Sequence, residues 1–162
     1  MEAIAARAGV GKATIYRWWP NKAAVVMDAF LAETTPQMPF PRTGSAREDL
    51  TRQIGSVIRL FSEPSVAGPF VALITEAAHD PQLAEALRGR FIAARRAAAR
   101  EVFTEGIRRG ELRSELDIDV AIDALYGAVY YRLLVSGEPL TSRYAQALVD
   151  LLYPALIARP SS

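Results

Sequence analysis

The 162-residue sequence predicts an all-α protein, with a short N-terminal helix-turn-helix followed by a larger helical domain. Apolar residues recur at helical spacing in most segments of the chain. Helix-capping residues, glycines and prolines separate these segments from one another. No run of alternating apolar and polar residues bounded by turn signals indicates a strand. We therefore expect about eight helices and no sheet.

Composition narrows the class of protein. The sequence has no cysteine, which excludes disulfides and thiolate metal sites. No run of eighteen apolar residues occurs and the N-terminus lacks the features of a secretory signal, so we expect a cytoplasmic protein with no membrane partner. Apolar residues make up 51% of the chain, enough to require both a core and a subunit interface. Residues 1–22 carry four basic residues against one acidic residue, which gives a basic head on a slightly acidic body and favours a DNA-binding end.

Residues 3–22 predict two short helices around a tight turn. Gly9 ends the first helix and Pro20 ends the second, because proline disfavours helix in the residue before it. In the second helix Ile15 and Trp19 lie four residues apart and face inward. The outer face keeps basic, hydroxyl and aromatic side chains, namely those of Lys12, Thr14, Tyr16, Arg17 and Trp18. A short helix with such a face suits the major groove of DNA.

The stretch IAARAGVGKATIYRWWPNK, with the apolar start of the next helix up to Phe30, resembles the helix-turn-helix of the tetracycline-repressor (TetR) family of bacterial transcription regulators. A bare helix-turn-helix pattern is weak evidence, but Ala-Gly-Val, Thr-Ile-Tyr and an aromatic-Pro-Asn-Lys ending together are specific. The resemblance implies that Tyr16 and Lys22 hold phosphates. It also implies a set of residues at or beside the base edges, which are Lys12, Ala13, Thr14, Arg17 and Trp18.

The resemblance also implies an architecture. The body of such proteins is a ligand-binding and dimerisation domain, with a pocket among the middle helices and a four-helix dimer bundle built by the last two long helices. The chain departs from the family in having Gly11 where serine is usual. The family also places an amphipathic helix before the one that starts here at Glu2, so we expect the DNA-binding domain of residues 1–34 to be partial.

Two functions from different classes follow. The first is a ligand-responsive transcriptional regulator, usually a repressor in this family, which binds a palindromic operator as a homodimer and is released by a small-molecule inducer. The alternative is a dimerising, ligand-binding module without DNA affinity. An enzyme is not expected, because the sequence contains no catalytic constellation and no Gly-rich phosphate loop. No cofactor is expected, and the lone His79 does not indicate a metal site.

The rest of the chain divides at residues 34–45, which hold three prolines and one glycine and predict a linker to a second domain of residues 45–158. Asn21 caps a helix before this linker. After it, Ser45 and Glu48 predict a capping box. The helix that follows is broken at Pro64, Gly68 and Pro69, and a shorter, mostly buried helix spans 70–78.

Three longer helices complete the prediction. Asp80 and Pro81 start a helix that ends before Gly110. Its arginine-rich face is interpreted as solvated surface rather than as a second nucleic-acid site. Asp117 caps a helix over 118–136 that is apolar nearly all round and so is buried on more than one side. The last helix spans about 141–158 and contains Pro154, which we expect to disturb it.

Two sets of residues are candidates for further sites. Aromatic side chains in the body predict a ligand cavity, with plain core as the alternative, and they are Phe61, Phe70, Phe91, Tyr126 and Tyr130. Small residues on one late helix and leucines on the last helix predict the dimer interface, and they are Ala121, Ala124, Ala128, Leu148, Leu151 and Leu152.

Overall fold

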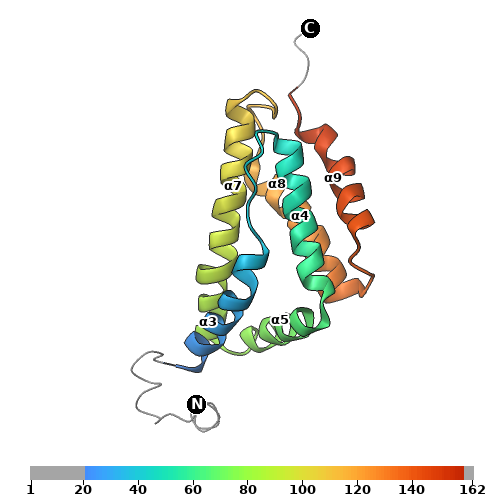
Figure 1. Ribbon diagram of the computed structural model, residues 1–162. Helices are drawn as coiled ribbons and strands as arrows, with labels where there is room; N and C mark the ends of the chain where they lie inside the picture. The colour runs from blue at the N-terminus through green and yellow to red at the C-terminus, as the bar shows by residue number, and fades with distance from the viewer. Residues whose placement is uncertain (1–20, 159–162) are drawn as a thin grey trace.

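Four helices stand side by side and a fifth crosses their lower end (Figure 1). The computed structural model describes residues 21–158. The upright helices are α4 (Ala46–Ser62), α7 (Ala93–Arg108), α8 (Ile118–Tyr131) and α9 (Ser142–Leu156), and the crossing helix is α5 (Pro64–Ala77). Within the described residues no strand occurs, and the one ladder-type pairing is an isolated bridge between Leu112 and Ile157. The all-α prediction is confirmed.

Helix starts lie where side chains can cap them. Each of the predicted caps accepts a hydrogen bond from a backbone N–H in the first turn, and these residues are Asn21, Ser45, Asp80 and Asp117. Thr141, near which the last helix was predicted to start, caps that helix in the same way. The capping box at Ser45 is only half formed. The carboxylate of Glu48 pairs with Arg52, and the backbone N–H of Ser45 donates to the hydroxyl of Thr43.

Helix α5 begins at Pro64, so the prediction that residues 64–69 form a break was wrong. Pro64 occupies the first turn, where a missing N–H costs nothing. Pro69 lies inside the helix and leaves the Ser65 carbonyl without its usual donor. Ser65 is exposed, so water can take the place of that donor.

The predicted helix over 80–109 forms, but not as uniform α-helix. It consists of α6 (Pro81–Ala86), a π-helical segment η2 (Leu87–Ile92) and α7. A second π-helical segment, η3 (Arg132–Ser136), extends α8 and ends at Gly137, whose φ of 68° is left-handed. π-Helical segments are rare in proteins overall, and those that occur are often found at functional sites.

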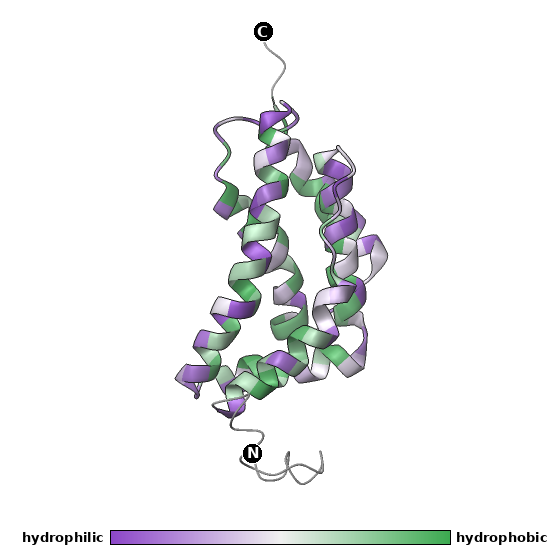
Figure 2. Ribbon diagram, turned by 60° about the vertical axis from the view of Figure 1, so that its left-hand side comes forward, coloured by the Kyte–Doolittle hydropathy of each residue, from purple (hydrophilic) through white to green (hydrophobic). Residues whose placement is uncertain are grey.

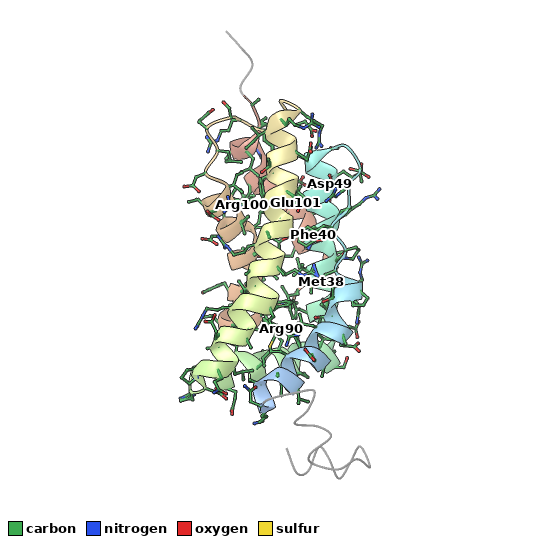
Figure 3. All side chains as sticks on the ribbon, turned by 90° about the vertical axis from the view of Figure 1, so that its left-hand side faces the viewer. Met38, Phe40, Asp49, Arg90, Arg100 and Glu101 are labelled. Carbon is green, nitrogen blue, oxygen red and sulfur yellow. The ribbon has the colours of Figure 1, made fainter. Side chains whose placement is uncertain are left out.

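The connection after helix α3 (Lys22–Thr34) is packed against the body rather than free. A short 3₁₀ turn, η1 (Thr35–Gln37), leads into Met38, whose side chain is 1% exposed. Arg95 of α7 donates a hydrogen bond to the Met38 carbonyl, and its guanidinium lies 5.2 Å from the centre of the Phe40 ring. Met38 and Phe40 lie along the flank of α7, between the levels of Arg90 and Arg100 (Figure 3).

Hydrophobic and hydrophilic residues alternate in bands along the helices, as expected for helices that each bury one face (Figure 2). No single helix in residues 21–158 is long and apolar enough to cross a membrane. The pair α4 and α5, bent by 89°, reaches the length and composition of a span only when its two helices are taken together.

A close backbone approach in the upper half of the body is made by Gly106 of α7. A β-carbon placed there would lie 2.7 Å from Cδ1 of Leu112 and 3.0 Å from Cβ of Ala46. Gly106 also accepts backbone hydrogen bonds from Glu111 and Leu112 through its carbonyl. A glycine therefore allows α7, the start of α4 and the connector near Leu112 to meet.

We expect Gly106→Ala to destabilise the fold by about 1–3 kcal/mol, because the added methyl group overpacks a site bordered by buried side chains. Gly55→Ala is the matched control, since Gly55 is also helical and a β-carbon added there would meet nothing within 4 Å. That control should stabilise by about 0.5–1 kcal/mol through helix propensity. Urea unfolding followed by circular dichroism measures both, and equal effects would contradict the packing argument.

Candidate ligand cavity and DNA-binding segment

Of the predicted DNA-contacting residues, Lys22 is the first residue of α3, whereas Lys12, Ala13, Thr14, Tyr16, Arg17 and Trp18 lie outside the described residues. The side chain of Lys22 is 64% exposed, and its Nζ lies 3.7 Å from Oε1 of Glu76 on α5. An ion pair between two exposed side chains is worth about 0–1 kcal/mol. Lys22 can therefore exchange this carboxylate for a phosphate at small cost.

Three of the predicted pocket residues belong to the core. Phe61, Phe70 and Phe91 are each at most 2% exposed. Their rings pack on one another, with centroids 4.7 Å apart for Phe61 and Phe70 and 5.8 Å apart for Phe70 and Phe91. In this conformation these three residues form plain core, which is the alternative to a ligand cavity.

The other two predicted pocket residues, Tyr126 and Tyr130 of α8, line a cavity of about 350 Å³ between α7 and α8. Six further residues complete its wall: Ile92, Arg95, Arg96, Ile122, Asp123 and Gly127. The volume is within the range of small-molecule sites, roughly 300–1,000 Å³. Apolar side chains with a few polar groups are also the usual lining of such sites.

Two buried polar side chains, Tyr126 in the cavity wall and Gln53 outside it, have no hydrogen-bond partner. The hydroxyl of Tyr126 is buried and unpaired. Gln53 of α4 is 1% exposed, and both the oxygen and the nitrogen of its amide are unpaired. The amide lies close enough to influence the pKa of Tyr126, but the two side chains do not meet in hydrogen-bonding geometry. Each unpaired buried group costs roughly 1–3 kcal/mol, so their presence requires an explanation.

Arg95 provides the cavity with a half-buried cation. Burial lowers the pKa of its guanidinium, and the nearby hydroxyls of Tyr126 and Tyr130 partly offset this effect. Within residues 21–158 no carboxylate lies at ion-pair distance from Arg95. By contrast, Arg96 pairs with Asp119 at 2.8 Å and also with Asp123. Arg95 and Gln53 were both missed from the sequence.

A larger groove of about 620 Å³ lies between residues 40–44 and α7. Its charged side chains are already paired with carboxylates. Arg42 pairs with Glu101 at 2.7 Å, and Arg100 pairs with Asp119 of α8. These charges neutralise one another, whereas Arg95 in the cavity between α7 and α8 has no carboxylate at ion-pair distance within residues 21–158. The smaller cavity is the better candidate site.

Ring contacts join this cavity to α3, the helix that directly follows the predicted helix-turn-helix. The ring centroid of Tyr130 lies 5.9 Å from that of Phe70. Phe70 stacks in turn on Phe30 of α3 at 5.5 Å, and Phe91 meets Phe30 edge-on at 5.1 Å. An ion pair between Arg90 and Asp28 ties α3 to the π-helical segment η2.

The predicted dimer residues fall into three groups. Ala124 and Leu151 are exposed, with Leu151 at 76%. Ala128 and Leu152 are half-buried, whereas Ala121 and Leu148 are 5% and 6% exposed and are covered within the subunit. The helical period turns those last two inward, toward neighbouring helices.

Most of the large exposed apolar side chains in this region are not among the residues predicted for the dimer interface. These side chains are Val120 at 61%, Tyr131 at 59%, Leu134 at 39% and Val135 at 70% exposure, together with Leu151. A helix that is apolar nearly all round gives no sign of which residues face its own subunit and which face outward.

Sequence comparison decides the family. A family model described as "Tetracyclin repressor-like, C-terminal domain" matches residues 40–152, and one described as "Bacterial regulatory proteins, tetR family" matches residues 1–29. The chain belongs to the TetR family of bacterial transcription regulators. The predicted resemblance is thus confirmed, and this TetR-family chain is a DNA-binding transcriptional regulator by its relatives and fold.

Individual relatives of this TetR-family chain agree. The HTH-type transcriptional regulator YdeS of Bacillus subtilis is 43% identical over 150 residues, which cover 92% of this chain and 75% of YdeS. The HTH-type regulator Mb1581 of Mycobacterium bovis is 32% identical over 157 residues, covering 96% and 77% of the two chains. The crystal structure of the TetR-family regulator SCO0332 matches with a TM-score of 0.83 at 34% identity, covering 97% of this chain and 86% of that one.

We expect Tyr126→Phe and Gln53→Leu each to raise the free energy of unfolding by up to about 1 kcal/mol, because each removes buried polar atoms that have no partner. Tyr144→Phe is the matched control. The hydroxyl of Tyr144 donates to the Ala128 carbonyl at 3.2 Å, so its loss should cost about 0.5–1.5 kcal/mol. Thermal and urea unfolding measure the three variants. Destabilisation by Tyr126→Phe equal to that of Tyr144→Phe would show that the Tyr126 hydroxyl is hydrogen-bonded.

Proposed function

We propose that this TetR-family regulator is a repressor that binds a palindromic operator as a homodimer and leaves the operator when a small molecule enters the cavity between α7 and α8. One observation carries the ligand response. The rings of Tyr130, Phe70 and Phe30 form a continuous series of contacts from the cavity wall to α3. A change at the cavity therefore has a short packed route to the helix that follows the DNA-binding segment.

The response is a shift between two conformations. A dimer reads two operator half-sites when its recognition helices lie about 34–36 Å apart, one turn of DNA. A ligand that binds more tightly to a conformation with another spacing lowers the population that fits DNA. Packed rings adopt discrete arrangements rather than deforming continuously, so moving Tyr130 favours a concerted move of Phe70 and Phe30.

The dimer is supported by the exposed apolar face of α8, η3 and α9. Val120, Tyr131, Val135 and Leu151 are each more than half exposed, which is unusual for large apolar side chains. Ala124 and Gly127 lie on the same exposed side of α8 and allow a partner helix to approach closely. An obligate homodimer buries about 2,000 Å² or more, and a two-fold axis would bring this face against its own copy.

DNA contact by the predicted residues is supported by the sequence of the recognition helix and by the position of Lys22. Lys22 is the first residue of α3, which lies at the lower end of the body (Figure 1) and follows the predicted recognition helix in the sequence. Its Nζ lies 3.7 Å from the carboxylate of Glu76, which is a long distance for an ion pair. We assign Lys22 and Tyr16 to phosphates, and Lys12, Ala13 and Thr14 to the base edges, with Arg17 and Trp18 beside them.

For the dimer, Leu151→Glu should convert the protein to monomer, because it would bury an unpaired charge in the interface. Val71→Glu is the control, since Val71 is an exposed large apolar residue on α5, outside the proposed interface. Sedimentation at low micromolar concentration should give a dimer for the unmodified chain and for Val71→Glu. A monomer of 17.7 kDa for the unmodified chain would contradict the dimer and the two-half-site mechanism.

For DNA binding, Lys22→Ala should weaken binding to all sequences alike and reduce the slope of log K against log salt by about 1, as expected for one lost phosphate contact. Glu76→Gln should instead strengthen binding at low salt, by up to about fivefold, because it frees Lys22 and removes a negative charge near DNA. Fluorescence anisotropy with DNA from upstream of the gene and with unrelated DNA measures both effects.

Glu48→Gln serves as the charge control for Glu76→Gln, since Glu48 lies in the first turn of α4 at the opposite end of the body (Figure 1). It should leave DNA affinity unchanged. A change in sequence preference alone with Lys22→Ala would contradict the phosphate assignment. Absence of DNA binding by the unmodified protein, with dimer and ligand binding retained, would favour the alternative of a ligand-binding module.

A further inference from the structure

The charges that line the cavity between α7 and α8 do not cancel. Three charged side chains line it: Arg95, Arg96 and Asp123. Arg96 and Asp123 pair with each other, and Arg96 also pairs with Asp119. Arg95 uses one N–H on the Met38 carbonyl, a neutral acceptor, and has no carboxylate partner within the described residues. The cavity therefore presents one uncompensated positive charge.

Two tyrosines line the cavity wall with this charge, and both act on the pKa of Arg95: Tyr126 and Tyr130. The hydroxyl of Tyr126 and the amide of Gln53 are unpaired, and both residues are more than nine-tenths buried. A phenol is protonated at neutral pH and can donate, and burial only strengthens this by raising the pKa of Tyr126 and that of Tyr130, the latter to about 12. A cation with neighbouring O–H donors is complementary to an anion.

Other classes of ligand fit less well. A cationic ligand would lie against Arg95, and two like charges repel more strongly in a partly buried site than in water. A wholly apolar ligand would fill the cavity but leave the hydroxyl of Tyr126 unpaired. Ile92 and Ile122 give the same cavity an apolar wall, so the complementary molecule has an anionic end and an apolar body.

Building on the proposed function, we propose that the inducer is an organic carboxylate whose anionic end is held by Arg95 and the Tyr126 hydroxyl and whose apolar body lies against Ile92 and Ile122, and that it acts by drawing Arg95 away from the Met38 carbonyl. The unpaired hydroxyl of Tyr126, a residue of the cavity wall, is then a partner that the ligand satisfies.

The same arginine explains how binding reaches the DNA-binding segment. Arg95 lines a second hollow with Met38 and Phe40, and its contacts with these two residues join the connection after η1 to α7. A carboxylate is a stronger acceptor for a guanidinium than a peptide carbonyl, and it can bind two N–H groups at once. The anion therefore competes for Arg95 and loosens residues 38–40, which follow α3 and η1 directly.

The first test compares acids with their own amides. Octanoate and 4-phenylbutanoate are titrated into the full chain by calorimetry, beside octanamide and 4-phenylbutanamide, which have nearly the same shape and no charge. We expect the acids to bind at least about tenfold more tightly than the amides, a difference of about 1.4 kcal/mol. Equal affinities for acid and amide, or binding by no acid at millimolar concentration, would overturn the proposal.

Three variants locate the anion. Arg95→Gln should abolish the preference for acid over amide, whereas Arg88→Gln, which removes an exposed arginine on η2 that pairs with Glu85, should leave it unchanged. Tyr126→Phe should reduce acid affinity severalfold without loss of thermal stability, a combination that a purely structural role does not produce. An unchanged acid preference in folded Arg95→Gln protein would overturn the assignment, and Tyr126→Phe keeps the test open if Arg95→Gln does not fold.

DNA release separates this inference from the function on which it rests. In the anisotropy assay, 4-phenylbutanoate should release DNA from the unmodified protein and from Arg88→Gln, but not from Arg95→Gln. DNA binding that responds to no carboxylate would overturn the inference and leave the regulator proposal standing. Selective binding of acids by a protein that binds no DNA would overturn the regulator proposal and support the ligand class alone.

Discussion

The stacking of phenylalanine and tyrosine rings at the lower end of the bundle is the contact on which the remaining structure depends. Phe30, Phe61, Phe70, Phe91 and Tyr130 come from α3, α4, α5, η2 and α8, and each ring touches at least one other. Aromatic pairs contribute about 0.5–1.5 kcal/mol beyond their buried area. The cluster therefore holds α3 against the body and fixes where the DNA-binding segment is attached.

A tightly packed cluster also limits how α3 can move. Ring positions are interdependent, because a displaced Tyr130 leaves a gap beside Phe61 and Phe70 that other rings must fill. The π-helical segment η2 places Phe91 in this cluster and Arg90 against Asp28 of α3. One wider turn of helix thus contributes both an apolar and an ionic contact to the helix that follows the DNA-binding segment.

The sequence was sufficient for the fold class and for most helix starts, because those depend on local signals. Capping residues such as Asp80 and Asp117 act on the first turn of their own helix, and their effect does not depend on the rest of the fold. The π-helical segments and the continuation of α5 through Pro69 were not predictable in this way. They depend on tertiary packing and on water reaching Ser65, which a local pattern does not encode.

The candidate site was only partly predictable for the same physical reason. Tyr126 and Tyr130 were identified as aromatic residues at the right helical positions, whereas Arg95 was grouped with exposed arginines.

Gln53 was not considered, although it did carry a signal, since it lies on the apolar stripe of α4 between Leu50 and Val57. A lone polar residue on such a stripe is costly to bury, so it indicates either a partner in the core or a ligand.

Gly127 connects the cavity between α7 and α8 to the proposed dimer face. It lines the cavity with Tyr126, and it is also exposed on the side of α8 that carries Ala124. If two subunits meet through this side, the partner borders the open edge of the cavity. A ligand that binds one arrangement of the two subunits more tightly favours that arrangement, and the coupling is reciprocal. Gly127 would then border both the ligand cavity and the dimer interface.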